Sequence, residues 1–185
     1  MIEENEGLSE NEAEELPQLE IDPMKMQQLL QKLRDEQNLI MGIAAGLIAA
    51  LISAVIWAVV TALTNYQIGW MAIGVGIFVG FAVKKYGKGI DTGFGIVGGV
   101  LAALGCAVGN LLAVIIMVSK SQGIGILELA SQLTPQVVVQ VMKATFQPMD
   151  AIFYLIGLYE GYQFSFRQLT EEELLSVARD DNQQM

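Results

Sequence analysis

Residues Asn65–Lys88, NYQIGWMAIGVGIFVGFAVKKYGK, decide the fold. The stretch opens with polar and aromatic residues, continues as an apolar run marked by glycines, and closes with three lysines. This order is typical of a membrane crossing, because aromatic residues favour the water–lipid boundary and lysines favour its cytosolic side. The stretch therefore predicts one membrane span.

The charges of this 185-residue chain are few and segregated. Only 16% of the residues are charged, compared with about 25% in soluble domains. Residues 37–83 and 92–119 carry no charge. Both runs exceed the roughly 20 apolar residues that cross a bilayer. We therefore expect an all-α, polytopic membrane protein surrounded by a lipid bilayer.

Acidity is concentrated at the N-terminus. Residues 1–38 hold eleven acidic and three basic residues, a net −8, whereas the remainder holds nine acidic and seven basic residues, a net −2. No basic patch is present to neutralise phosphates, which argues against nucleic acid as a partner. The acidic start and the late first apolar run also argue against a cleavable signal peptide.

The sequence lacks the residues that most metal and redox chemistry requires. It has no histidine and a single cysteine, Cys106, inside an apolar run. An intrachain disulfide is impossible, and zinc, haem or iron–sulfur ligation has no ligand set. We expect no cofactor, no metal and no enzymatic activity, and we expect Cys106 to act as a small packing residue.

Run lengths divide the chain into four regions. An acidic tail at 1–22 is predicted to be disordered, and it either solubilises the protein or docks to a basic partner. An amphipathic helix at 23–37 starts at Asp22-Pro23 and lies either on lipid headgroups or on the protein's own cytosolic face. A membrane domain at 38–166 follows, and 167–185 form a short cytosolic helix and tail. The domain is predicted to contain spans at about 39–64, 68–85, 94–118 and 148–166.

Two short helices, at Ile124–Leu133 and Gln136–Phe146, are predicted between the third and fourth spans. Both are too short to cross a bilayer, so we expect them to be interfacial or re-entrant on the outer face.

Small residues recur at four-residue spacing along every span. Such stripes let helix backbones approach closely in lipid, where there is little hydrophobic drive between helices. The glycines predicted to pack helices together are Gly42, Gly46, Gly76, Gly80, Gly99, Gly105, Gly109, Gly157 and Gly161.

Polar residues inside the spans form the candidate site. Asn110 is either an interhelical hydrogen-bonding residue or part of a polar path. Asp150, Tyr154 and Glu160 share about a third of the last helix's circumference and are expected to face the bundle. The hypothesis for Glu160 is a pair with Lys84 or Lys85, or a hydrated contact with tyrosines, and its role is either structural or proton- or cation-responsive.

The distribution of lysine and arginine predicts the orientation. With both termini in the cytosol, eight basic residues lie inside and two outside, and an odd number of spans would break this asymmetry. The inside set is Lys25, Lys32, Arg34, Lys84, Lys85, Lys88, Arg167 and Arg179, and the outside set is Lys120 and Lys143. We expect a multi-pass protein of the bacterial cytoplasmic membrane.

The segments Thr64–Gly76, TNYQIGWMAIGVG, and Leu104–Asn110, LGCAVGN, resemble a family of small bacterial multi-span membrane proteins with no assigned activity. The resemblance covers about residues 38–118, and it extends through Tyr159–Arg167 to the last span. Some relatives carry a Cys-rich zinc ribbon before the membrane part, where this chain has an acidic tail without cysteine. The resemblance implies the architecture and no reaction.

Three functions fit these observations to different degrees. The small-residue stripes best fit a structural or accessory membrane protein. Such a protein would work through protein contacts, as a homo-oligomer or with another membrane protein. A subunit of an oligomeric transporter or channel would need Glu160 and Asn110 on a polar path. A membrane enzyme would have to use Glu160, Asp150 or tyrosines as acid and base.

Overall fold

The computed structural model describes residues 21–66 and 69–178, and this part of the chain is all-α. It contains eight helices: α1 (Pro23–Glu36), α2 (Leu39–Thr64), α3 (Met71–Gly87), α4 (Thr92–Gln122), α5 (Ile126–Ser131), α6 (Pro135–Thr145), α7 (Pro148–Gln163) and α8 (Glu171–Val177). The predicted all-α class is confirmed. Most of the predicted acidic tail lies outside the described residues.

The chain divides into two compact units. Unit 1 comprises Met1–Leu30 and Leu169–Met185, and unit 2 comprises Gln31–Gln168. In the described part of unit 1, a single antiparallel bridge joins Ile21 to Ala178. The Asp22 N–H donates to the Val177 carbonyl over 2.8 Å. The sequence did not predict this link between the segments that flank α1 and α8, because one bridge leaves no periodic pattern.

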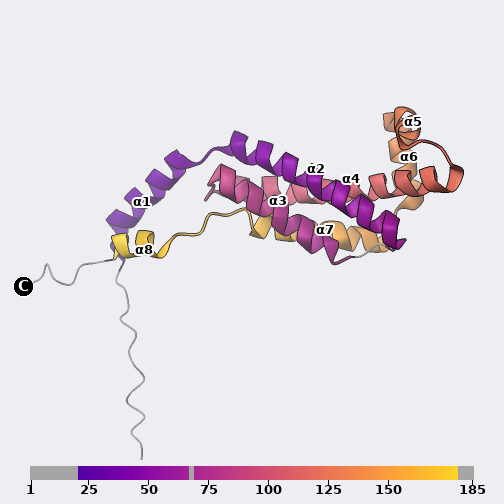
Figure 1. Ribbon diagram of the computed structural model, residues 1–185. Helices are drawn as coiled ribbons and strands as arrows, with labels where there is room; N and C mark the ends of the chain where they lie inside the picture. Colours follow the sequence, from indigo (N-terminus) through magenta and orange to yellow (C-terminus); the bar gives the residue numbers. More distant parts are fainter. Residues whose placement is uncertain (1–20, 67–68, 179–185) are drawn as a thin grey trace, which may run out of the picture. The chain divides into compact units, whose positions relative to one another are not determined.

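Unit 2 is a bundle of α2, α3, α4 and α7, drawn side by side in Figure 1. α3 and α4 contact each other, and each packs against both α2 and α7. Facing glycines give the directions. Gly76 lies against Gly157 and Gly80 against Gly161, so α3 and α7 run parallel, whereas Gly42 meets Gly87, so α2 and α3 run antiparallel.

Two of the helices, α2 and α4, are long and apolar enough to cross a membrane. α2 has 26 residues and α4 has 31, whereas α3 has 17 and α7 has 16. At 1.5 Å per residue, the two shorter helices are about 25 Å long. Length and composition alone therefore support two spans.

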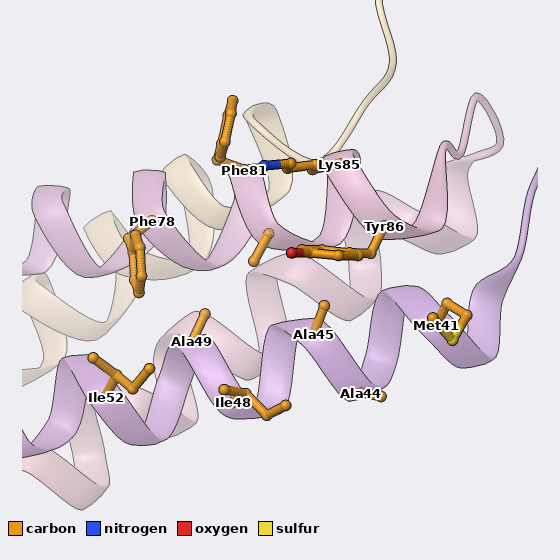
Figure 2. Close-up of a pocket in the computed structure, with 11 residues that line it drawn as sticks. Met41, Ala44, Ala45, Ile48, Ala49, Ile52, Phe78, Phe81, Lys85 and Tyr86 are labelled. Atoms are coloured by element: carbon orange, nitrogen blue, oxygen red, sulfur yellow. The ribbon is translucent and has the colours of Figure 1, made fainter.

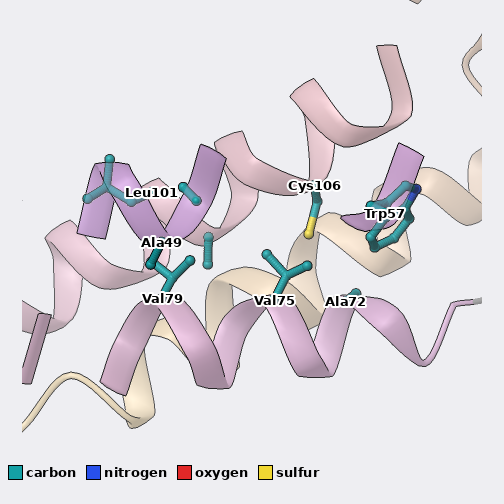
Figure 3. Packing of buried hydrophobic residues seen from close by; sticks show 9 residues of the cluster. Ala49, Trp57, Ala72, Val75, Val79, Leu101 and Cys106 are labelled. Atoms are coloured by element: carbon teal, nitrogen blue, oxygen red, sulfur yellow. The ribbon is translucent and has the colours of Figure 1, made fainter. Parts of the chain in front are cut away.

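The core of the bundle is built from small side chains, as Figure 3 shows. Ala72, Val79, Ala102 and Cys106 are fully buried where α3 and α4 meet. Trp57 from α2 is the largest fully buried side chain among the described residues. A core of alanine and valine lets four backbones approach closely, which is how helices gain contact in lipid.

All nine glycines expected to pack helices together lie at contacts between helices. A Cβ on Gly161 would lie 2.6 Å from the Gly98 carbonyl oxygen, and one on Gly109 would lie 2.9 Å from Trp57 Cβ. Real Cβ atoms do not approach that closely. The contacts lie within one chain, so the stripes are used by the bundle itself.

One end of the bundle, here called the lysine end, carries Lys84, Lys85 and Lys88. Polar contacts fix the α3–α4 loop there. Gln37 donates its side-chain amide to Asp91 and accepts from the Ile90 N–H at 3.2 Å. Arg34 pairs with the same Asp91 at 3.4 Å, and the Asn38 N–H donates to the Gly87 carbonyl at 2.8 Å.

A further ion pair at this end joins Arg167 to Glu36 at 3.0 Å. We call these contacts of Arg34, Gln37 and Asn38, together with the Arg167–Glu36 pair, the loop clamp.

The opposite end, here called the amide end, is where α2 ends and α7 begins. Asn65 ends α2 in the left-handed region, with φ 55°, and its N–H donates to the Thr61 carbonyl. Asparagine tolerates this conformation better than other residues with a Cβ. Lys120 donates to the Ala62 carbonyl over 3.3 Å, which places a cation at the negative end of the α2 dipole.

Several predicted bounds shift in the structure. The first span matches α2, but the second begins at Met71 rather than at about 68, and the third continues to Gln122 rather than to about 118. α4 continues because Ser119, Lys120 and Ser121 are all compatible with a helix, and Gly123, with φ 69°, caps it after Gln122. The two short helices expected at 124–133 and 136–146 are α5 and α6, and both contact α4.

Candidate functional site at the amide end

A polar pocket of about 370 Å³ opens at the amide end of unit 2. Its walls come from the last turn of α2, the second half of α4 and the junction between α6 and α7. The lining residues are Thr61, Asn65, Tyr66, Asn110, Ala113, Val114, Met117, Thr145 and Gln147. The polar groups among them are hydroxyls and amides, and none carries a formal charge.

Thr61 is the most informative residue of the pocket. Its side chain is 3% exposed, and its hydroxyl has no hydrogen-bond partner within the described residues. Threonine in a helix usually donates to a carbonyl in the preceding turn, as Thr64 does with Val60 at 2.8 Å. A buried hydroxyl without a partner costs about 1–3 kcal/mol. Thr61 therefore contributes a buried hydroxyl, with no hydrogen-bond partner among the described residues, to the wall of the pocket.

Asn110 connects the pocket wall to α7. Its side-chain amide donates to the Tyr154 hydroxyl at 3.4 Å, and Asn110 is 7% exposed. The structure brings together two candidates that the sequence places 44 residues apart. This bond is an interhelical hydrogen bond of the kind expected for Asn110, and it holds the amide at the pocket wall.

Asp150 has a local structural role. It is 2% exposed, and its carboxylate accepts from the Gln147 N–H at 2.8 Å as the N3 member of a capping box. A carboxylate is also favoured at the positive end of the helix dipole. The signal Gln147-Pro148-Met149-Asp150 was readable as a helix start, but Asp150 was instead expected to contribute to an intramembrane polar site.

Glu160 faces the bundle but does not form the expected pair. A Cβ on Gly76 would lie 2.5 Å from Glu160 Cβ, so Glu160 lies level with Gly76 of α3. Lys84 follows Gly76 by eight residues, about 12 Å of helical rise. Within the described residues, the ion pairs are those of Arg34 and Arg167, and Glu160 joins neither. Among the described residues the expected ion pair with Lys84 or Lys85 does not form, because the groups lie at different depths. The alternative, a hydrated contact of Glu160 with tyrosines, stays a prediction.

The candidate residues therefore separate into distinct places. Asn110 and Tyr154 meet beside the pocket, Asp150 caps α7, and Glu160 lies further along α7. No group of three acidic or cysteine residues that would hold a metal ion occurs within residues 21–66 and 69–178. Thr61 and Gln147 were missed as pocket residues, because no local sequence pattern shows that a threonine and a glutamine from distant segments meet in one pocket.

Comparison with protein families, with curated proteins and with solved structures finds no match to this chain.

Proposed function

We propose that the chain is a four-span protein of the cytoplasmic membrane that acts as an accessory subunit and docks a partner protein through its amide-end pocket. The spans would be α2, α3, α4 and α7. α3 and α7 pack along α2 and α4, so they share the depth of the two longer helices. Their length of about 25 Å approaches the roughly 30 Å thickness of the hydrocarbon core. Aromatic residues next to their ends suit the water–lipid boundary.

The charge distribution supports an orientation with the lysine end in the cytosol. Lys84, Lys85 and Lys88 gather at that end, whereas Lys120 at the amide end is bound to a helix carbonyl. Lysine and arginine near span ends favour the cytosolic side. The pocket would then open on the outer side of the membrane.

The docking proposal depends on the buried Thr61 hydroxyl, which has no hydrogen-bond partner in the described part of the chain and lies on the wall of an uncharged polar pocket. Hydroxyl and amide groups without formal charge suit a neutral polar guest, such as a backbone peptide or an amide side chain. An outer loop of a partner protein, either a second copy or a different chain, presents such groups.

The centre of the bundle supports docking over conduction. Ala72, Val75, Ala102 and Cys106 fill the interior as a buried apolar cluster. The Asn110–Tyr154 bond and Glu160 lie six residues apart along α7, about 9 Å of rise. A polar path through one chain would have to cross this packed layer, which is costly in lipid.

Site-specific photo-cross-linking in cells tests the proposal. A photoreactive residue at Tyr66, which lines the pocket and is 75% exposed, should give one discrete adduct. The same residue at Trp70, which is 81% exposed but does not line the pocket, is the matched control. The adduct mass distinguishes a second copy from another protein.

Filling the pocket should remove the adduct. Met117→Trp places a bulky side chain in the lining, whereas Ile116→Trp lies on the same helix outside it. We expect Met117→Trp to abolish the adduct and Ile116→Trp to keep it. Equal adducts from positions 66 and 70, or an adduct that persists with Met117→Trp, would contradict docking through this pocket.

A further inference from the structure

A second cavity, of about 470 Å³, is an open groove between α2 and α3. Its lining residues are Met41, Ala44, Ala45, Ile48, Ala49, Ile52, Phe78, Phe81, Ala82, Lys85 and Tyr86. Figure 2 shows Ala45 and Ala49 pointing from α2 towards α3, with the Tyr86 ring over Ala45. Alanines thus form the floor, and larger side chains form the rims.

The groove has the length and polarity of one lipid tail. It extends along α2 from Met41 to Ile52, eleven residues or about 16 Å of helical rise. Half of a bilayer's hydrocarbon core is about 15 Å. Apart from Lys85 and Tyr86 at one end, every lining side chain is apolar. An acyl chain from a single leaflet therefore fits along it.

The polar end of the groove lies at the lysine end of the bundle. The Lys85 ammonium lies 5.8 Å from the Tyr86 ring centroid, and both side chains are exposed. Among the described residues Lys85 forms no ion pair or hydrogen bond, whereas Arg34 and Arg167 are paired with carboxylates. Its charge is free to meet an anion.

We propose that this groove binds one anionic phospholipid from the leaflet at the lysine end. The acyl chain lies along the alanine floor, and the phosphate accepts from the Lys85 ammonium and the Tyr86 hydroxyl. A cation at headgroup depth beside an apolar channel is complementary to an anionic lipid in both charge and shape. The inference rests on the proposed membrane topology and is independent of the amide-end pocket.

Native mass spectrometry of the full chain in detergent tests the charge component. Dioleoyl phosphatidylglycerol and dioleoyl phosphatidylcholine, which share the same tails, are titrated separately. We expect the first phosphatidylglycerol to bind several-fold more tightly than phosphatidylcholine. Lys85→Gln should weaken phosphatidylglycerol binding about fivefold and leave phosphatidylcholine unchanged. Lys88→Gln removes an exposed lysine three residues further on, outside the groove, and should change little.

Occlusion of the groove tests the tail component. Ala45→Phe should displace both lipids, whereas Leu47→Phe, on the lipid-facing side of α2 and outside the groove, should displace neither. A thermal melt of each variant separates occlusion from misfolding. Equal affinity for the two lipids, equal losses for Lys85→Gln and Lys88→Gln, or unchanged lipid binding by folded Ala45→Phe would each overturn the proposal.

Discussion

Individual glycines differ in what their missing side chain allows. Gly74 and Gly76 lie two residues apart on α3, yet a Cβ on Gly74 meets nothing within 4 Å. A Cβ on Gly76 would lie 2.8 Å from the Gly157 carbonyl oxygen and 2.5 Å from Glu160 Cβ. Substitutions at the two positions therefore distinguish two effects. Gly76 reports on the close packing of α3 against α7, whereas Gly74 reports only on the cost of glycine in a helix.

Gly76→Ala should destabilise the bundle by about 1–3 kcal/mol, because the added methyl group forces the Gly157 carbonyl and the Glu160 side chain of α7 to move away. Gly74→Ala should leave stability unchanged or raise it by up to about 1 kcal/mol, since alanine favours the helix. Reversible unfolding of the purified variants in detergent measures both. Equal effects of the two substitutions would refute packing through Gly76.

Glu160→Gln should raise the melting temperature at neutral pH. The carboxylate has no ion pair within the described residues, and an uncompensated charge in an apolar span is costly. Glu36→Gln is the control, because it removes the partner of Arg167 at 3.0 Å and should lower the melting temperature. A fall for Glu160→Gln as large as that for Glu36→Gln would reveal an ionic partner for Glu160.

Residue spacing in the sequence predicted which residues face another helix better than it predicted which residue each of them meets there. The four-residue spacing identifies Gly76 and Gly161 as contact positions, because spacing alone fixes a helix face. No ion pair between Glu160 and a lysine occurs among the described residues, since residue spacing within one helix does not reveal its depth against a neighbouring helix. Gly98, which faces Ser165 Oγ and the Gly161 carbonyl, was missed because it lies outside the chosen stripe.

The sequence predicted the helices better than the contacts that hold their connecting loops. The span predicted from run length at about 39–64 coincides with α2 (Leu39–Thr64). The structure adds its caps, because Asn38 accepts from the Met41 N–H and Asn65 ends the helix. The short helix predicted within 167–185 is α8, which begins after a capping box formed by Thr170 and Glu173. The loop clamp was not predicted, because Gln37 and Asp91 lie 54 residues apart and nothing local marks either.

Gln37→Ala should loosen the α3–α4 loop. The side chain donates to Asp91 and accepts from the Ile90 N–H, and a typical net hydrogen bond contributes about 1 kcal/mol. Hydrogen exchange of residues 87–91 should become faster, while exposed Gln31 on α1 supplies the control Gln31→Ala. Unchanged exchange in Gln37→Ala would show that the loop is held by other contacts.

At the scale of the whole molecule, the long uncharged runs predicted the long helices of the all-α bundle, and the polar positions predicted little of the pocket. Thr61, Gln147 and Tyr66 come from three separate segments, so their meeting depends on how the helices assemble. The small-residue stripes also suggested an oligomer. The structure uses them inside one chain, so a partner would have to bind elsewhere, as the amide-end pocket proposes.

The most direct test of the four-span account is cysteine accessibility in intact cells. In a Cys106→Ala background, single cysteines replace Tyr66 at the amide end and Lys88 at the lysine end, both exposed. We predict that a membrane-impermeant maleimide labels position 66 from outside and reaches position 88 only after the cells are opened. Labelling of position 66 only from the cytosolic side, or of both positions from the same side, would contradict the topology.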